Sequence, residues 1–296
     1  MDKPRILHFL TPLPNISPFD VNMAYDAGFV VAGYTHIELK DVTALTQDAM
    51  FSRAPQDAAK TVLFIGGRDA LLALDMADAA RKAMFPPFEI SVFVDPSGAF
   101  TTAAAMVAAV EKQLKQRGAT LAGLKVAVFG AKGIVGGLVG EIAASAGAHV
   151  TLVAHDRSNA VPQKAAAFRA RFGHDFAVAD GSTEAGRRTV VADAEVILAA
   201  AKAGVEAVSR DELGAARRLK VAADVNAVPP AGIAGVDPKA DGAPLGIGEA
   251  VGIGALAIGN IKFRVQHELL KRLHQADKAQ HIDFHAAYAL AHDLAA

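Results

Sequence analysis

Three glycines at three-residue spacing form the clearest chemical pattern in this sequence. Gly130, Gly133 and Gly136 follow an apolar run, and a stretch of helical character begins directly after them. A strand, a tight glycine turn and a helix start in this order can bind a pyrophosphate, because backbone N–H groups approach the phosphates where no Cβ intervenes and the helix N-terminus adds unpaired donors. The predicted binding residues are Gly130, Ala131, Lys132, Gly133, Ile134, Val135 and Gly136.

The glycine pattern departs from the usual dinucleotide motif, but an acidic residue further along the chain supports a dinucleotide site. Counted back from Gly136, G-x-G-x-x-G requires glycine where the sequence has Ala131, with an additional glycine one position earlier. Asp156 lies 20 residues beyond Gly136, between His155 and Arg157. An acid at this position can accept hydrogen bonds from the ribose hydroxyls of NAD, and an adjacent arginine can bind the 2′-phosphate of NADP. The pattern therefore predicts both NAD and NADP as cofactors. The alternative is an ordinary βα turn with surface charges.

These residues need a scaffold of parallel strands. Short apolar runs alternate with longer stretches of helical period, which is typical of α/β layers. The predicted strands are residues 6–10, 29–32, 61–65 and 90–94, then 125–129, 149–153, 176–178, 196–198 and 221–223. Helices are predicted between them, including 68–84 and 101–116, and at the end of the chain over 255–276 and 283–294. The sequence therefore predicts an α/β fold of two domains, the second a Rossmann-type parallel sheet.

The predicted domain boundary lies in residues 118–123, where a polar helix end and two glycines precede a new strand. This boundary predicts an N-terminal α/β substrate domain over 1–120 and a Rossmann NAD(P)-binding domain over 121–261. We expect the C-terminal helices, about 262–296, to return and complete the first domain. The apolar, glycine-rich segment 250–261 is too short to cross a bilayer and is interpreted as buried packing.

Composition excludes several classes of function. The chain has 296 residues, a net charge of -1 and no cysteine, so thiolate metal sites and disulfides are absent and neither nucleic acid nor a membrane surface is an expected partner. The N-terminus lacks the long apolar run of a signal peptide, and we expect a cytoplasmic protein. His281, His285 and His292 could mimic a metal site, but Asp283 is a good N-cap that would leave His281 outside the helix, so no metal is predicted. The basic run 217–220 is interpreted as a solvated loop.

Several blocks spread over the chain carry a more specific resemblance. They read SPFDVNMA at 17–24, LTQDAMFSRAPQD at 45–57, FVDPSGAFTT at 93–102, DVNAVPPAGI at 224–233 and GIGALAIGNIK at 252–262. Taken together, they resemble the NAD(P)-dependent methylene-tetrahydromethanopterin dehydrogenases of methylotrophic bacteria. The resemblance implies oxidation of the methylene bridge between two pterin nitrogens in one-carbon metabolism, a small-molecule pterin substrate and a homo-oligomer, with a trimer as one candidate state.

Site residues follow from the resemblance and from position. Lys262 resembles the active-site lysine of the family, and Asp20 is expected to bind the pterin or stabilise its cation, against the alternative of an N-cap acid. Asp95, Thr101 and Thr102 are expected to line the substrate cleft, although capping of the helix at 101 would use the same groups. Asn226 follows a predicted strand, where it could bind the nicotinamide amide or form a turn.

Three alternative functions stay open at this point. A methylene-tetrahydrofolate dehydrogenase would act on the same reacting carbon. A nicotinamide-sensing protein without turnover is a different class, and Ala131 in the turn gives it mild support. A shikimate-dehydrogenase-like reductase shares the two-domain layout, and Lys262 with Asp20 could mimic its lysine–aspartate pair.

Overall fold

The computed structural model describes residues 3–295 and divides the chain into two compact units. The first unit runs to Thr101 and adds Phe263–Ala287, and the second comprises Thr102–Lys262 and the residues from Tyr288 onward. The chain passes between the units within three helices, α4 (Ala99–Lys115), α9 (Ala255–Gln275) and α10 (Phe284–Ala295). This division by compactness falls inside α4, whereas the boundary expected from the sequence lies at 118–123, after that helix has ended.

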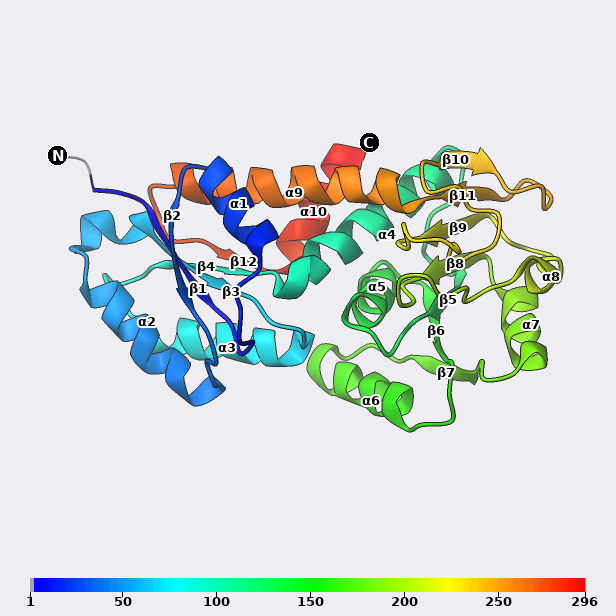
Figure 1. Ribbon diagram of the computed structural model, residues 1–296, viewed down its shortest axis with the longest axis horizontal. Helices are drawn as coiled ribbons and strands as arrows, with labels where there is room; N and C mark the ends of the chain where they lie inside the picture. The colour runs from blue at the N-terminus through cyan, green and yellow to red at the C-terminus, as the bar shows by residue number, and fades with distance from the viewer. Residues whose placement is uncertain (1–2, 296) are drawn as a thin grey trace. The chain divides into compact units, whose positions relative to one another are not determined.

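The first unit is built on a five-stranded parallel sheet in the order β12-β4-β3-β1-β2 (Figure 1). Every residue of β3 and β4 is buried, which is typical of a parallel sheet covered on both faces. The strands are β1 (Ile6–Leu10), β2 (Val30–Tyr34), β3 (Thr61–Ile65), β4 (Ser91–Val94) and β12 (His281–Ile282). The other helices are α1 (Pro18–Asp26), α2 (Val42–Phe51) and α3 (Ala70–Ala83), with short 3₁₀ turns at Leu39–Asp41, Pro55–Lys60 and Pro96–Gly98.

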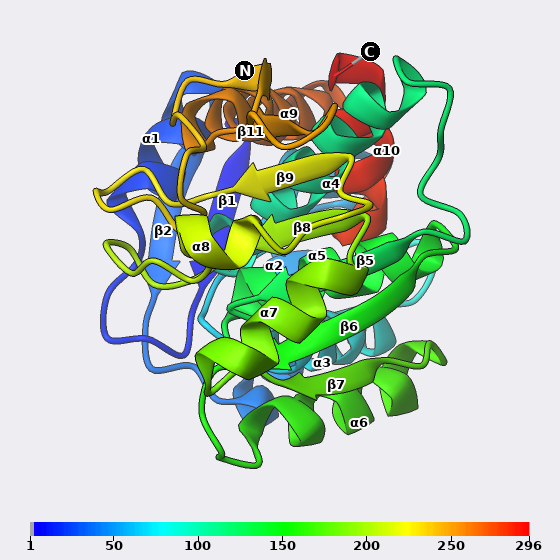
Figure 2. The ribbon, with the colours of Figure 1, turned by 90° about the vertical axis from the view of Figure 1, so that its right-hand side faces the viewer.

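The second unit is built on a seven-stranded sheet in the order β10-β11-β9-β8-β5-β6-β7, and Figure 2 shows β9, β8, β5, β6 and β7 side by side in this order. Only β10 runs antiparallel to its neighbour. The strands are β5 (Lys125–Phe129), β6 (His149–Ala154), β7 (Ala177–Asp180), β8 (Val196–Ala199), β9 (Val221–Asp224), β10 (Asp241–Pro244) and β11 (Val251–Ile253). The helices are α5 (Ile134–Ser145), α6 (Ala160–Phe172), α7 (Glu184–Asp193) and α8 (Arg210–Leu213).

This strand order confirms the expected Rossmann-type sheet. The chain builds outward from β5 through β6 to β7 and then crosses to β8 on the other side of β5. The direction of winding therefore reverses between β5 and β8, and open α/β sheets bind ligands at the carboxyl ends of the strands at such a point.

The structure corrects the sequence analysis at short elements. Strands β10, β11 and β12 were not expected, and segment 250–261, interpreted as packing, contains β11 and the first turns of α9. The expectation that His281 lies outside the last helix is confirmed, because His281 belongs to β12 and Asp283 accepts a hydrogen bond from the backbone N–H of His285 at 2.9 Å. Within residues 3–295, no group of three His, Asp or Glu side chains could hold a metal ion, and no helix is long and apolar enough to cross a membrane.

Candidate nucleotide site and active-site residues

The glycine-rich turn between β5 and α5 is closely packed. Gly130 has φ +78°, and a Cβ at this position would lie 2.3 Å from the carbonyl oxygen of Ala200 at the end of β8. A Cβ on Gly136 would lie 2.2 Å from the carbonyl oxygen of Gly130. Gly133 is the N-cap of α5 and donates its N–H to the Gly130 carbonyl at 2.9 Å. Only glycine therefore fits at both ends of this turn, and the turn leaves the N-terminus of α5 accessible to a ligand's phosphates.

The first glycine of the motif is Gly130 in this fold, because Gly130 takes the positive φ and the close approach to β8. Counting back from Gly136 with the usual spacing had assigned that position to Ala131. The turn is one residue longer than the usual motif, and Ala131 is buried within it. Ala131 therefore replaces no motif glycine, and the mild support that it gave to a protein without turnover disappears.

A pocket of about 690 Å³ opens at the carboxyl ends of β5, β6 and β8. It lies where the sheet reverses its winding, and its volume is in the range of small-molecule and cofactor sites. Much of its wall is apolar. Its charged side chains are three cations, Lys132, Arg187 and Lys202, and one carboxylate, that of Glu206. Its lining includes Phe129, Gly130, Lys132, Gly133, Ile134, Val135, Val153, His155, Gly181, Arg187, Lys202, Val205 and Glu206.

Asp156 stands beyond the tip of β6, beside the glycine-rich turn. One carboxylate oxygen accepts hydrogen bonds from the hydroxyl and the backbone N–H of Ser158, and the other lies 3.2 Å from His155 Nε2 and 3.5 Å from Lys132 Nζ. The two bonds from Ser158, assisted by the nearby charges, hold the pKa of Asp156 below its ordinary value. The carboxylate is therefore ionised and can accept from ribose hydroxyls. Arg157 approaches Asp180, whose pKa is lowered chiefly by hydrogen bonds from Ser182 and in part by the Arg157 charge.

Lys164 is a residue that sequence reasoning missed. It projects from α6, and its Nζ donates to the carbonyl oxygens of Lys132 and Gly133 at 2.7 and 2.8 Å. These bonds hold the glycine-rich turn from outside and place an ammonium group near the expected pyrophosphate. No sequence motif marks this contact, because it joins residues more than thirty positions apart.

Asn226 structures the loop after β9. Its side-chain oxygen accepts from the N–H groups of Gly204 and Val228 at 3.3 and 3.0 Å, and its Nδ2 donates to the Pro230 carbonyl at 2.9 Å. The neighbouring Asp224 is fully buried and accepts three backbone N–H bonds, and burial raises the pKa of its carboxyl. The turn expected as the alternative role of Asn226 is therefore present, and its contact with the nicotinamide stays a prediction.

In the first unit, Asp20 is buried in the first turn of α1. Ser17 caps this helix by accepting from the Asp20 backbone N–H at 3.3 Å, so Asp20 is not the N-cap. The Asp20 carboxylate instead accepts a hydrogen bond of 2.7 Å from Gln266 Nε2, and Gln266 is itself fully buried. Sequence reasoning missed Gln266, although it follows Lys262 by four residues in α9, the spacing that places two side chains on one helix face.

Asp95 and Thr101 form a buried cap at the start of α4. One Asp95 oxygen accepts from the N–H groups of Phe100 and Thr101 at 2.9 and 3.2 Å, and the other accepts from Thr101 Oγ1 at 2.7 Å. These contacts fulfil the capping alternative for both residues. Thr102, the next residue in α4, and Lys262 in α9 fall in the second unit. The substrate roles of these four residues stay predictions.

Comparison with known proteins gives the family. The family model described as methylene-tetrahydromethanopterin dehydrogenase, N-terminal, matches residues 18–97. An NAD(P)-dependent methylenetetrahydromethanopterin dehydrogenase from Methylorubrum extorquens is 50% identical over 292 residues, covering 98% of each chain. The bifunctional protein MdtA of the same organism is 30% identical, covering 94% of this chain and 95% of its own.

A solved structure supports the fold alone. Shikimate 5-dehydrogenase from Listeria monocytogenes, in complex with shikimate and NAD, matches with a TM-score of 0.52 at 12% identity, covering 91% of each chain. Such low identity carries no argument about the reaction. With half of its residues identical to the first of these relatives over nearly the full length, the chain belongs to the family of NAD(P)-dependent methylenetetrahydromethanopterin dehydrogenases.

Proposed function

We propose that this protein transfers a hydride from the methylene bridge of methylene-tetrahydromethanopterin to NAD or NADP and leaves the methenyl cation. The observation that carries the proposal is the 50% identity to a dehydrogenase of that name over 98% of the chain. The glycine turn, the pocket at the reversal of the sheet and the ionised Asp156 support it independently, because together they suit a dinucleotide.

The residues of the second unit fit the cofactor. The space that Cβ atoms would fill at Gly130 and Gly136 is occupied by backbone, so the turn stays tight and the N–H groups at the start of α5 can receive the pyrophosphate. Asp156 would accept hydrogen bonds from the hydroxyls of the adenosine ribose. Asn226, which fixes the loop after β9, would lie near the nicotinamide amide. When bound, the nicotinamide supplies the hydride acceptor.

The remaining chemistry concerns a positive charge that develops on the pterin. A carbon flanked by two nitrogens loses hydride readily, since both nitrogens share the resulting cation, and the step releases no proton that a base must remove. The protein must orient the carbon and stabilise the charge. Asp20 is suited to the second task, because Gln266 holds its buried carboxylate by a hydrogen bond of 2.7 Å.

Lys262 would donate a hydrogen bond to the pterin carbonyl. The resemblance to the family supports this role, and Lys262 lies four residues before Gln266 in α9. In α4, Asp95 and Thr101 would act by fixing the helix start that presents Thr102 to the substrate. Asp20 and Lys262 are therefore the proposed catalytic residues, and Thr102 the proposed substrate contact.

The proposal is tested by mixing the purified protein with methylene-tetrahydromethanopterin or methylene-tetrahydrofolate and following formation of NADH or NADPH. We expect faster turnover of the methanopterin substrate, and loss of turnover in Asp20→Ala and Lys262→Ala. A preference for the folate would replace the proposed substrate, and nucleotide binding without any turnover would indicate a nicotinamide sensor. Unchanged rates in both variants would remove the site assignment. Light scattering of the same sample tests the homo-oligomer that the family resemblance implies.

A further inference from the structure

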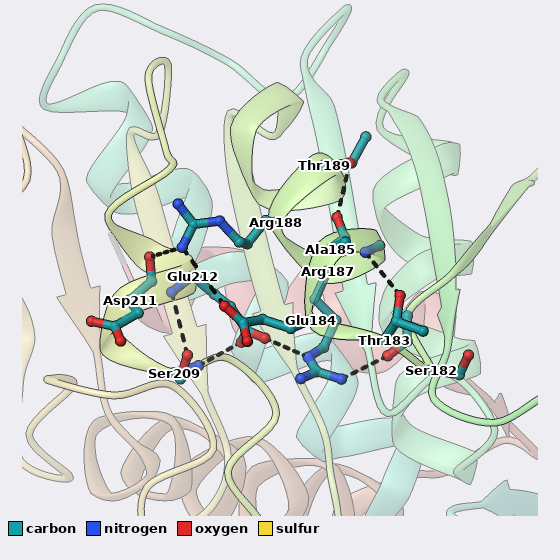
Figure 3. Close-up of polar contacts among 12 residues, drawn as sticks. Ser182, Thr183, Glu184, Ala185, Arg187, Arg188, Thr189, Ser209, Asp211 and Glu212 are labelled. Carbon is teal, nitrogen blue, oxygen red and sulfur yellow. Dashed lines mark hydrogen bonds and ion pairs between the residues drawn. The ribbon is translucent and has the colours of Figure 1, made fainter.

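Arg187 brings a fixed guanidinium group to the wall of the nucleotide pocket. It lies in the first turns of α7, which Thr183 caps by accepting from the Gly186 N–H at 3.1 Å. Its Nε donates to Glu212 Oε1 at 2.7 Å and its Nη1 to the carbonyl oxygen of Gly181 at 3.0 Å (Figure 3). Two different segments therefore hold the guanidinium in one orientation.

Glu212 is itself immobilised. Its side chain is only 2% exposed, and its second oxygen accepts from the Ser209 N–H at 2.9 Å while the Ser209 hydroxyl accepts from the Glu212 N–H at 3.3 Å. This reciprocal capping box fixes the carboxylate at the start of α8. Burying two charged groups has a large desolvation cost, so the ion pair between Arg187 and Glu212 is weak evidence that it stabilises the fold. A role of Glu212 in positioning the Arg187 guanidinium explains the pair better.

The Arg187 guanidinium has N–H donors that are available to a ligand. Arginine carries five N–H groups, and Arg187 uses two of them in the part of the chain that the structure describes. The rest, including both on Nη2, have no acceptor there, and the side chain is 30% exposed where it lines the pocket. A rigid fork of charged donors suits a phosphate or a carboxylate.

The contacts of Gly181 place this fork beside the ribose end of the pocket. Gly181 follows β7 and donates its N–H to the carbonyl oxygen of Ala154, the last residue of β6, at 2.8 Å. Asp156, expected to bind the ribose hydroxyls, comes two residues after Ala154. A Cβ on Gly181 would lie 2.5 Å from Val153 Cγ1, so the close approach of the two strand tips requires glycine. Gly181 therefore lies about one strand spacing, roughly 5 Å, from the tip that carries Asp156, and the Arg187 guanidinium is hydrogen-bonded to Gly181.

We propose that Arg187 binds the adenosine 2′-phosphate of NADP and sets the preference of this enzyme between NADP and NAD, with Glu212 as its positioning residue. The inference rests on the proposed function, because it requires that the nucleotide occupies this pocket. Lys132 and Lys202 line the same pocket, so its cations outnumber its one carboxylate, which favours a dianionic group. Asp156 alone would repel such a group. Arg157, expected from the sequence to hold the 2′-phosphate, approaches Asp180 and does not line the pocket, so Arg187 supplies the opposing attraction.

The test compares Arg187→Met with Arg188→Met. Arg188 follows on the same helix, but its side chain extends to Asp211, where Nη1 donates to the backbone carbonyl at 3.1 Å, and it does not line the pocket (Figure 3). Dissociation constants for NADPH and NADH are measured by fluorescence titration. Loss of charge-assisted hydrogen bonds predicts NADPH binding about 10- to 100-fold weaker in Arg187→Met, with NADH affinity changed less than about twofold. Arg188→Met should change neither.

Further variants distinguish a selective loss of NADPH binding from misfolding of the Arg187→Met protein. Arg187→Met leaves a buried carboxylate, so the double variant Arg187→Met/Glu212→Gln removes both charges and should show the same selective loss. Glu212→Gln alone should weaken NADPH binding in part, since it keeps a hydrogen bond to Arg187 and loses the charge. Equal weakening of NADH and NADPH in a folded double variant, or no weakening, would overturn the inference. Failure of the unaltered protein to bind either nucleotide would overturn the proposed function and the inference with it.

Discussion

Gln266 donates a hydrogen bond to the buried carboxylate of Asp20 across a sequence separation of 246 residues. Asp20 is 4% exposed and Gln266 is not exposed at all, so neither group can exchange its partner for bulk water without a change of structure. A segment near the end of the chain therefore fixes the orientation of an acid near its beginning. A carboxylate oriented before the substrate arrives has little reorganisation left to make when a positive charge develops.

The first prediction concerns this pair. Asp20→Asn keeps the shape of the side chain and removes its charge, and we expect it to lower kcat/KM for the pterin by about 10²-fold or more. Gln266→Leu keeps the charge and loses the orienting bond, so a smaller loss, about tenfold, is expected. Binding of NADH, measured by fluorescence, should be the same in both variants and the unaltered protein. A fully active Asp20→Asn would remove Asp20 from the mechanism.

The second prediction separates two adjacent threonines. Thr101→Val removes the hydroxyl that donates to Asp95, so the free energy of unfolding should fall by about 1 kcal/mol. The two backbone N–H bonds to Asp95 still fix the helix start, so KM for the pterin should rise less than in Thr102→Val. Thr102→Val should instead raise KM about tenfold, by loss of one hydrogen bond to the substrate. Urea denaturation and initial rates measure the two effects. If KM rose in Thr101→Val and not in Thr102→Val, Thr101 would be the substrate contact in place of Thr102.

The parallel sheets could be predicted from the sequence, because each buried strand is a short apolar run between turn residues, as in 61–65 and 125–129. β12 could not, since two residues carry no periodicity. The glycine turn was found by its pattern, but its first glycine was misplaced because fixed spacing ignores a turn that is one residue longer and packs on Ala200. Gln266, Lys164 and Arg187 were missed for a common reason. Each acts through a partner distant in the sequence, and such pairs follow from the fold and leave no local signature.

The third prediction uses the close approach at the glycine turn. Gly130→Ala places a Cβ 2.3 Å from the Ala200 carbonyl oxygen at φ +78°, so we expect a loss of about 3 kcal/mol or more in unfolding free energy, or loss of nucleotide binding. Gly173→Ala is the matched control, because Gly173 has φ +86° with no atom within 4 Å of its Cβ position. It should show only the conformational cost, about 1 kcal/mol. Similar losses in the two variants would show that packing at Ala200 is unimportant.

The fourth prediction is a fall in stability on mild acidification. Burial is the main cause that lowers the pKa of His8, His274 and His281 below the ordinary value of 6.5, and the charges of Arg53, Arg5 and Arg81 add to it. Below that pH the unfolded chain binds more protons at these sites than the folded protein, so the free energy of unfolding rises with pH up to about 6.5 and these sites add no further slope above it. Urea midpoints between about pH 5 and 7 measure this. His8→Gln should reduce the slope, and an unchanged slope would contradict the assignment of His8.

The fifth prediction concerns Lys164, which should affect both nucleotides equally. Its ammonium group holds the carbonyl oxygens of Lys132 and Gly133 at 2.7 and 2.8 Å, and these residues shape the turn that would receive the pyrophosphate shared by NAD and NADP. Lys164→Met should therefore weaken NADH and NADPH by a similar factor, about tenfold, with kcat at saturating nucleotide nearly unchanged. Gln163→Met, at an exposed position of the same helix, is the control. A selective loss of NADPH would instead assign Lys164 to the 2′-phosphate and would weaken the separate role inferred for Arg187.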